Sequence, residues 1–145
     1  MKLKKLFLKY CEDNQFEINK NQLIIIENLE NFYKDNFNQY LLNKLFFKKK
    51  NKLGFYLNGD VGVGKTMILN FFLNELKEKK IRLHFNEFMV SFHDFIFKNE
   101  DKKNGIFFFV KELKKKAQII YFDEFQVTNI VDAMILGKLF KKIFE

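Results

Sequence analysis

Apolar residues in the N-terminal third of the chain recur every three or four positions, a spacing typical of amphipathic helices. The clearest series lies between residues 23 and 45 and consists of Leu23, Ile26, Leu29, Phe32, Tyr33, Phe37, Tyr40, Leu41 and Leu45. A polar connector of lysines and one asparagine follows at residues 48–52. The pattern therefore predicts an N-terminal helical segment over residues 1–50, followed by a second region that starts at residue 51.

This second region, residues 51–145, alternates short apolar runs with longer periodic ones. The apolar runs predict three strands, at residues 54–57, 81–89 and 118–125. The periodic runs predict three helices, at residues 66–79, 91–97 and 129–144. Thr128 suits the N-cap of the last helix, whereas residues 106–116 fit either a strand or a helix. Strands that alternate with helices form parallel βαβ units, so we expect an α/β fold with a parallel sheet.

The composition changes this picture little. With 145 residues, of which 48% are hydrophobic and 30% charged, the chain suits a soluble globular protein. Its net charge of +8 could indicate a nucleic-acid partner. However, only Arg82 among the 26 basic residues is an arginine, and the chain is also rich in Phe, Asn and Ile and lacks Pro. Codons rich in A and T produce this composition in almost any protein, and the lysines are scattered, so we do not expect nucleic-acid binding.

Cysteine usage and hydropathy indicate the compartment. Cys11 is the only cysteine, so an internal disulfide is impossible, which fits a reducing environment. The lysine-rich start has too short an apolar part for a signal peptide, and no apolar run approaches the length of a membrane span. We therefore expect a cytoplasmic protein without a membrane span.

The segment Gly59-x-x-x-x-Gly64-Lys65-Thr66 matches the phosphate-loop pattern, also called Walker A. Glycines allow the backbone to wrap closely around a phosphate, and successive N–H groups then point at the anion. Lys65 would bind the β- and γ-phosphates, and the Thr66 hydroxyl would bind Mg²⁺. The residues predicted to contact the nucleotide are Gly59, Asp60, Val61, Gly62, Val63, Gly64, Lys65 and Thr66.

A pair of acids, Asp123 and Glu124, ends the last apolar run, as in the Walker B motif. At the carboxyl end of a parallel strand Asp123 would bind Mg²⁺, and Glu124 would polarise the attacking water. This pair favours ATP hydrolysis, because the base-reading Asn-Lys-x-Asp motif of GTPases does not occur in the chain. The two histidines, His84 and His93, have no partner set for a metal site, so we interpret them as structural.

Three segments together resemble one family, the ZapE-type ATPases: "GFYLNGDVGVGKTMILNFF", "HFNEFM" and "YFDEFQVTNIVDAMILGKLF". The resemblance implies an AAA+-like P-loop NTPase core, here with an incomplete parallel sheet and the N-terminal helical segment. It matches the loop residues above to the phosphate loop, Asp123 to the magnesium aspartate and Glu124 to the catalytic glutamate. Of the family's N-terminal Asp-Pro-x-Gln element only Gln22 is present.

The resemblance also implies partners and limits. It suggests a role in cell division through the tubulin-like protein FtsZ, with self-association, and mitochondrial relatives are linked to protein quality control. Family members continue beyond this segment with a sensor residue and an arginine that completes a neighbouring site. We therefore expect residues 51–145 to be the first part of an ATPase domain, with little activity alone. Two alternatives stay open: another P-loop ATPase such as a helicase loader, and a non-enzymatic protein that binds nucleotide or partner subunits.

Overall fold

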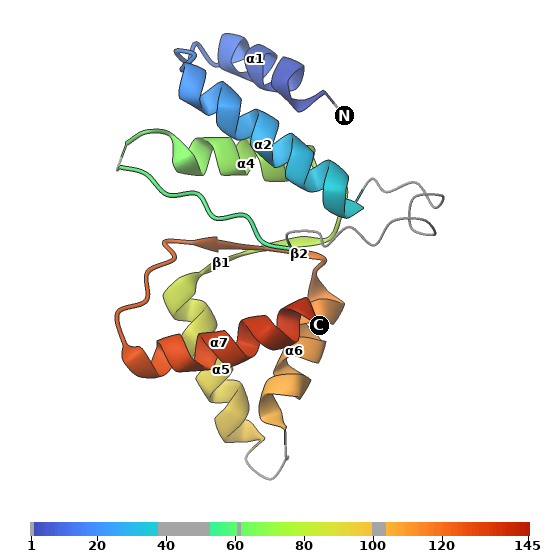
Figure 1. Cartoon of the computed structure of the whole chain (residues 1–145), viewed down its shortest axis with the longest axis vertical. Helices are drawn as coiled ribbons and strands as arrows, with labels where there is room; N and C mark the ends of the chain where they lie inside the picture. Colours follow the sequence, from blue (N-terminus) through green and yellow to red (C-terminus); the bar gives the residue numbers. More distant parts are fainter. Residues whose placement is uncertain (1, 38–52, 61, 100–103) are drawn as a thin grey trace. The chain divides into compact units, whose positions relative to one another are not determined.

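The computed structural model describes residues 2–37, 53–60, 62–99 and 104–145. Its elements, in chain order, are α1 (Leu3–Asp13), α2 (Lys20–Phe37), α4 (Lys65–Glu75), β1 (Lys80–His84), α5 (Phe85–Lys98), α6 (Gly105–Lys116), β2 (Ile119–Asp123) and α7 (Ile130–Phe144) (Figure 1). They form two compact units, Met1–Leu76 and Lys77–Glu145. The predicted boundary at residues 50 and 51 lies outside the described residues, as does the predicted helical structure after residue 37.

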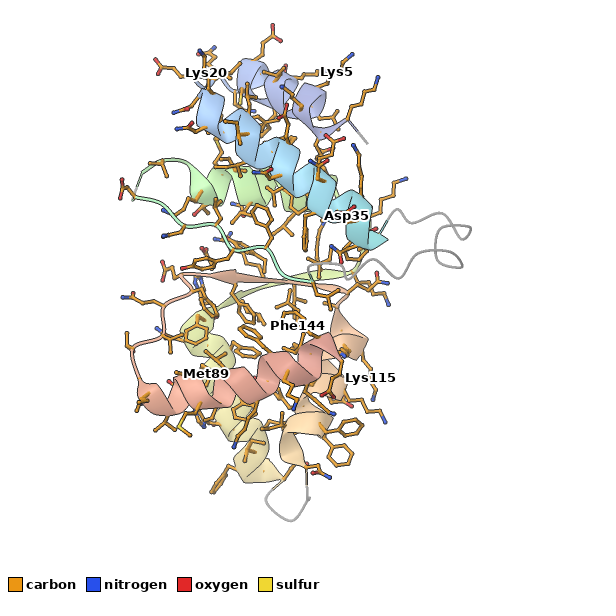
Figure 2. All side chains as sticks on the ribbon, in the orientation of Figure 1. Lys5, Lys20, Asp35, Met89, Lys115 and Phe144 are labelled. Carbon is orange, nitrogen blue, oxygen red and sulfur yellow. The ribbon has the colours of Figure 1, made fainter. Side chains whose placement is uncertain are left out.

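The first unit consists of α1, α2 and α4, which pack on one another (Figure 1). Its buried side chains are Leu3, Phe7, Cys11, Ile26, Leu29, Tyr33, Ile68, Phe71, Phe72, Leu73 and Leu76. Phe7 of α1 meets Phe71 of α4 edge to face, with ring centroids 5.1 Å apart, a favoured aromatic geometry. Charged side chains such as those of Lys5 and Lys20 lie on the outside of the unit (Figure 2). The predicted helical pattern of this region is confirmed for α1 and α2.

The predicted strand at residues 54–57 is not formed. No residue from 53 to 60 has strand structure, and Tyr56 is 72% exposed. A strand exists only where its backbone N–H and C=O groups pair with a neighbour. In the described part of the chain the only sheet pairs β1 with β2. Phe55 instead packs against Phe32 of α2, with ring centroids 5.8 Å apart.

The second unit is built on the parallel pair β1 and β2, in which Arg82 lies opposite Tyr121 and His84 opposite Asp123. One face of this pair packs against α5, α6 and α7 and includes Ile81, Leu83, Ile120 and Phe122. The buried core that these residues cover consists of Phe85, Phe88, Met89, Phe92, Phe109, Val110, Leu113, Leu136 and Leu139. Because side chains alternate along a strand, Arg82, Tyr121 and Asp123 share the opposite face. The predicted α/β class and parallel pairing are confirmed, with two strands in the sheet.

Several boundaries of the helices and strands differ from the prediction. Residues 85–89 continue as helix α5 rather than strand, because buried apolar residues there follow a three-to-four spacing. Helix α4 ends at Glu75 instead of residue 79, since the buried Leu76 takes extended backbone. Residues 106–116, which fit either a strand or a helix by sequence, lie in helix α6. The N-cap of α7 is Asn129 rather than Thr128, and its side chain accepts a 2.7 Å hydrogen bond from the Val131 N–H.

Candidate functional site

The glycine loop leads directly into α4, which begins at Lys65. Gly62 and Gly64 have φ angles of 85° and 84°, in the left-handed region that favours glycine. Among the described residues, a Cβ atom built on Gly62 would meet nothing within 4 Å, so the loop is open toward them on that side. Val61 lies outside the described residues. The loop therefore has the backbone freedom and the open space that close binding of a phosphate requires.

Lys65 folds back over the start of its own loop. Its Nζ donates hydrogen bonds to the carbonyl oxygens of Gly59 and Asp60, at 2.7 and 2.6 Å. The ammonium group is thus held at the loop, beside the positive N-terminal end of α4. Thr66, the second residue of α4, is exposed, and its hydroxyl has the oxygen chemistry that suits Mg²⁺. The arrangement can attract and hold a phosphate group.

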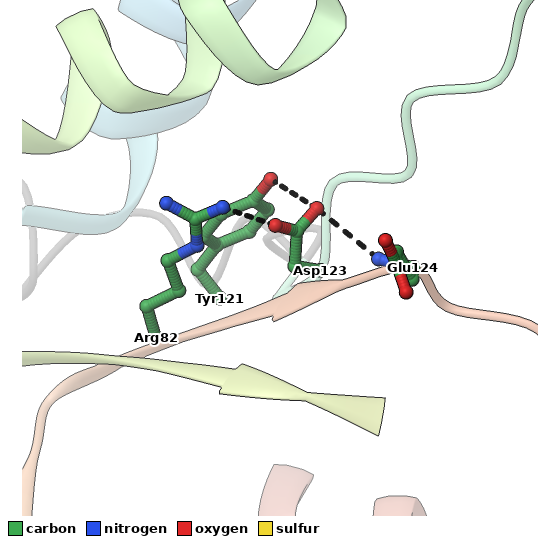
Figure 3. Close-up of polar contacts among 4 residues, drawn as sticks. All are labelled: Arg82, Tyr121, Asp123 and Glu124. Atoms are coloured by element: carbon green, nitrogen blue, oxygen red, sulfur yellow. Dashed lines mark hydrogen bonds and ion pairs between the residues drawn. The ribbon is translucent and has the colours of Figure 1, made fainter. Parts of the chain in front are cut away.

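The two predicted acids lie at the end of β2, in the second unit. Asp123 forms an ion pair with Arg82 and accepts hydrogen bonds from the Tyr121 hydroxyl and the Glu124 N–H, both at 3.1 Å (Figure 3). Partial burial acts to raise the pKa of Asp123, but the hydrogen bonds from Arg82 and Tyr121 outweigh it and keep that pKa below its ordinary value. The carboxylate is therefore ionised and already neutralised by the only arginine of the chain.

Glu124 follows with an unusual backbone. Its φ of 52° is rare for a residue with a side chain, and such conformations cluster at functional sites. The turn lifts the glutamate out of the strand, so its side chain is exposed. Glu124 and Asp123 therefore differ in surroundings: Asp123 is bonded by Arg82 and Tyr121 on the sheet, whereas Glu124 faces solvent.

The predicted site residues fall into two sets, and each set belongs to one compact unit. The glycine loop, Lys65 and Thr66 are in Met1–Leu76, whereas Asp123 and Glu124 are in Lys77–Glu145. Within the described ranges no group of three or more His, Cys, Asp or Glu side chains could hold a metal ion. Shared magnesium binding by Thr66 and Asp123 therefore stays a prediction.

Sequence reasoning missed two contacts in these sets. It did not pair Arg82 with Asp123, which lies on the same face of the sheet, two residues beyond Tyr121, the residue opposite Arg82. It also assigned no role to Gln22, whose side-chain amide lies against the glycine loop and donates to the Val63 carbonyl at 3.4 Å. The one signal in the sequence was that Gln22 matches a family element.

Of the two histidines, which the sequence analysis interprets as structural, His93 has its Nε2 atom 3.4 Å from the Asp132 carboxylate.

Comparison with known proteins gives a family. The family model for AFG1-like ATPases matches residues 2–145. The chain is 38% identical over 104 residues to lactation elevated protein 1 homolog B of Danio rerio, an alignment that covers 63% of this chain and 21% of the relative. It is 37% identical over 92 residues to the cell division protein ZapE of Escherichia coli K12, covering 63% of this chain and 24% of ZapE.

A third similar protein, the uncharacterised protein C115.02c of Schizosaccharomyces pombe, is 30% identical over 123 residues, covering 72% of this chain and 27% of the relative. The chain thus spans about a fifth to a quarter of the length of these relatives. No solved structure matches the chain. Among the described helices none has the length and apolarity needed to cross a bilayer.

Proposed function

Because the chain belongs to the AFG1-like ATPase family, we propose that it binds ATP at the loop formed by residues 59–66 and takes part in magnesium-dependent hydrolysis. One observation carries the proposal. The left-handed Gly64 ends the loop directly before α4, and Lys65 holds its ammonium group over the loop's first two carbonyls. Open backbone, a helix N-terminus and a fixed cation together suit a polyphosphate.

In this proposal each site residue has a distinct role. The loop N–H groups bind the phosphates, and Lys65 moves from the carbonyls of Gly59 and Asp60 to the phosphate oxygens. Thr66 and Asp123 would hold Mg²⁺, which would neutralise negative charge on the phosphates. Glu124, whose side chain is exposed, would orient the attacking water.

The Arg82–Asp123 ion pair supports slow turnover by the chain alone. A magnesium ion held by Asp123 has to compete with a guanidinium that already neutralises the carboxylate. Residues 54–57 also lack the strand that would anchor the start of the loop. We therefore expect nucleotide binding by the purified 145-residue chain, with little hydrolysis. Robust turnover that Lys65→Ala abolishes would contradict this expectation.

The binding test compares wild type with Lys65→Ala by isothermal titration with ADP and Mg²⁺. We expect the variant to bind about 10- to 100-fold more weakly, since a charge-assisted hydrogen bond contributes about 1.5–3 kcal/mol. Lys98→Ala, an exposed lysine at the end of α5, is the control and should bind like wild type. Equal affinity of wild type and Lys65→Ala would refute the proposed site.

We further propose a cellular role in cell division, which rests on the similarity to ZapE, named a cell division protein. A cytoplasmic location, self-association and contact with an FtsZ-type polymer belong to this proposal. Co-sedimentation of the chain with FtsZ polymers, with and without ATP, tests the contact. Absence of the chain from the pelleted polymers in both conditions would contradict it.

A further inference from the structure

Gln22 connects an N-terminal helix to the glycine loop. It belongs to the first turn of α2, and its Nε2 donates a long hydrogen bond of 3.4 Å to the carbonyl oxygen of Val63. A Cβ atom built on Gly64 would lie only 2.9 Å from the same Nε2. The Gln22 side chain therefore lies directly against the last turn of the loop before α4, although Gln22 and Val63 are 41 positions apart in the sequence.

The other end of the same amide is unsatisfied. The Gln22 Oε1 atom is buried and has no hydrogen-bond partner among the described residues. An unpaired buried acceptor is unfavourable. An apolar side chain of similar size would fill the space without this cost, so stability of the resting loop does not explain a glutamine here.

The geometry points to a role for Gln22 in positioning the phosphate loop, which rests on the proposed nucleotide binding. The Val63 carbonyl and the Gly64 N–H belong to one planar trans peptide, so they point in opposite directions. When Gln22 holds the carbonyl on its own side, the Gly64 N–H is turned away from α2. We propose that this fixes the Gly64 N–H toward the bound phosphate, and that Gln22 thereby acts on the phosphates and not on the base.

The backbone of Gly64 leaves room for this contact. Besides its φ of 84°, which favours glycine, a Cβ atom at this position would lie 2.9 Å from the Gln22 Nε2. Because that nitrogen is the free end of a flexible side chain, a substitution here would displace the amide from the loop.

The test measures binding of inorganic pyrophosphate and of ADP, each with Mg²⁺, by isothermal titration. The proteins are wild type, Gln22→Ala, Gln22→Met and the control Asn21→Ala, which changes an exposed neighbour on the same helix. We expect Gln22→Ala and Gln22→Met to weaken both ligands by the same factor, about three- to tenfold, as loss of one neutral hydrogen bond does. Asn21→Ala should leave both affinities unchanged.

Gln22→Met keeps the length of the side chain and removes only the amide. Wild-type affinity in this variant would show that packing alone matters and would overturn the inference. A loss for ADP without a loss for pyrophosphate would indicate contact with the base or ribose and would also overturn it. Melting temperatures measured without ligand should be the same or higher for Gln22→Met, which shows that a weaker affinity does not come from unfolding.

Lys65→Ala separates this inference from the proposed function. If Lys65→Ala weakens pyrophosphate binding and the Gln22 variants bind like wild type, the nucleotide site stands and the role of Gln22 is refuted. If wild type fails to bind either ligand, or binds no better than Lys65→Ala, the proposed function falls and the inference falls with it.

Discussion

Glu30 of α2 joins two helices of the first unit through one carboxylate. It accepts a 3.1 Å hydrogen bond from the Leu3 N–H at the start of α1 and forms an ion pair with Lys34. Its side chain is only 12% exposed. Partial burial acts to raise the pKa of Glu30, but Lys34 and the backbone N–H groups of Leu3 and Lys4 outweigh it and keep that pKa below its ordinary value.

This lowered pKa predicts how stability depends on pH. At pH 7 we expect Glu30→Gln to lower the free energy of unfolding by about 1 kcal/mol, because a negative charge at a helix N-terminus is lost. The contribution is fully present above the pKa of the unfolded chain and disappears as pH falls through the lower folded value. Urea unfolding of both proteins at several pH values between 3 and 7 should therefore show the difference shrinking toward acid.

Glu27→Gln serves as the control for this prediction. Glu27 also pairs with α1, through Lys4, but both side chains are about half exposed, and such pairs contribute little. We expect it to change the free energy of unfolding by less than about 0.5 kcal/mol. An effect of Glu30→Gln that equals that of Glu27→Gln, or that does not depend on pH, would contradict the argument.

At the scale of single residues, the sequence proposes which residues form the candidate site, and their roles stay predictions. The glycines, Lys65 and the Asp-Glu pair stand out because the chemistry proposed for them depends on spacing within short segments. The contacts of Gln22 with the loop and of Arg82 with Asp123 join residues 41 positions apart. Such contacts follow from packing and strand register, which no local pattern determines.

Helix α5 shows why one element was predicted wrongly. Residues 81–84 alternate as a strand, and the apolar run continues into the helix without a polar break. For so short a run, strand and helix patterns overlap. What decides is the core: Phe88 is 2% exposed and packs against Phe122 of β2 and Phe109 of α6, with ring centroids 4.8 and 5.7 Å away.

The helical geometry of α5 predicts opposite results for two phenylalanines. We expect Phe88→Ala to lower the free energy of unfolding by about 3–5 kcal/mol, since it leaves a cavity in the core. Phe97, on the same helix, is 74% exposed, so Phe97→Ala should cost less than about 0.5 kcal/mol. Thermal unfolding by circular dichroism measures both. Similar losses for the two variants would contradict the assigned face of α5.

The strand predicted at residues 54–57 shows a different limit of prediction from a local sequence pattern. Its apolar composition is that of a strand, yet an extended segment needs a neighbour to bond with, and the described residues supply none. Helices α1, α2, α4 and α7 and the strands β1 and β2 could be predicted, apart from their exact ends, because periodicity and length identify them. The state of residues 54–57 could not, because it depends on which segments lie beside it.

In the whole molecule, the proposed site draws on two compact units that each have their own core. The loop with Lys65 is in the first unit, and Asp123 with Glu124 is in the second. A ligand that contacts both the loop with Lys65 and the pair Asp123 and Glu124 should slow amide hydrogen exchange in both units. Mg²⁺ is the proposed link between the nucleotide and Asp123. Its removal should therefore abolish the slower exchange around Asp123 and keep that in the loop.

Hydrogen exchange with mass spectrometry can follow the two units separately. With ADP and Mg²⁺ we expect slower exchange in peptides that cover residues 59–66 and in those that cover residues 121–125. With pyrophosphate and a chelator, the protection of residues 59–66 should persist at higher ligand concentration, whereas the protection of residues 121–125 should vanish. Without a metal ion, a negatively charged phosphate is repelled by the Asp123 carboxylate. Asp123→Ala with ADP and Mg²⁺ should reproduce this separation. Protection that stays confined to residues 59–66 in the wild type with Mg²⁺ would show that Asp123 is not a ligand, and hydrolysis would then have to use a different metal site.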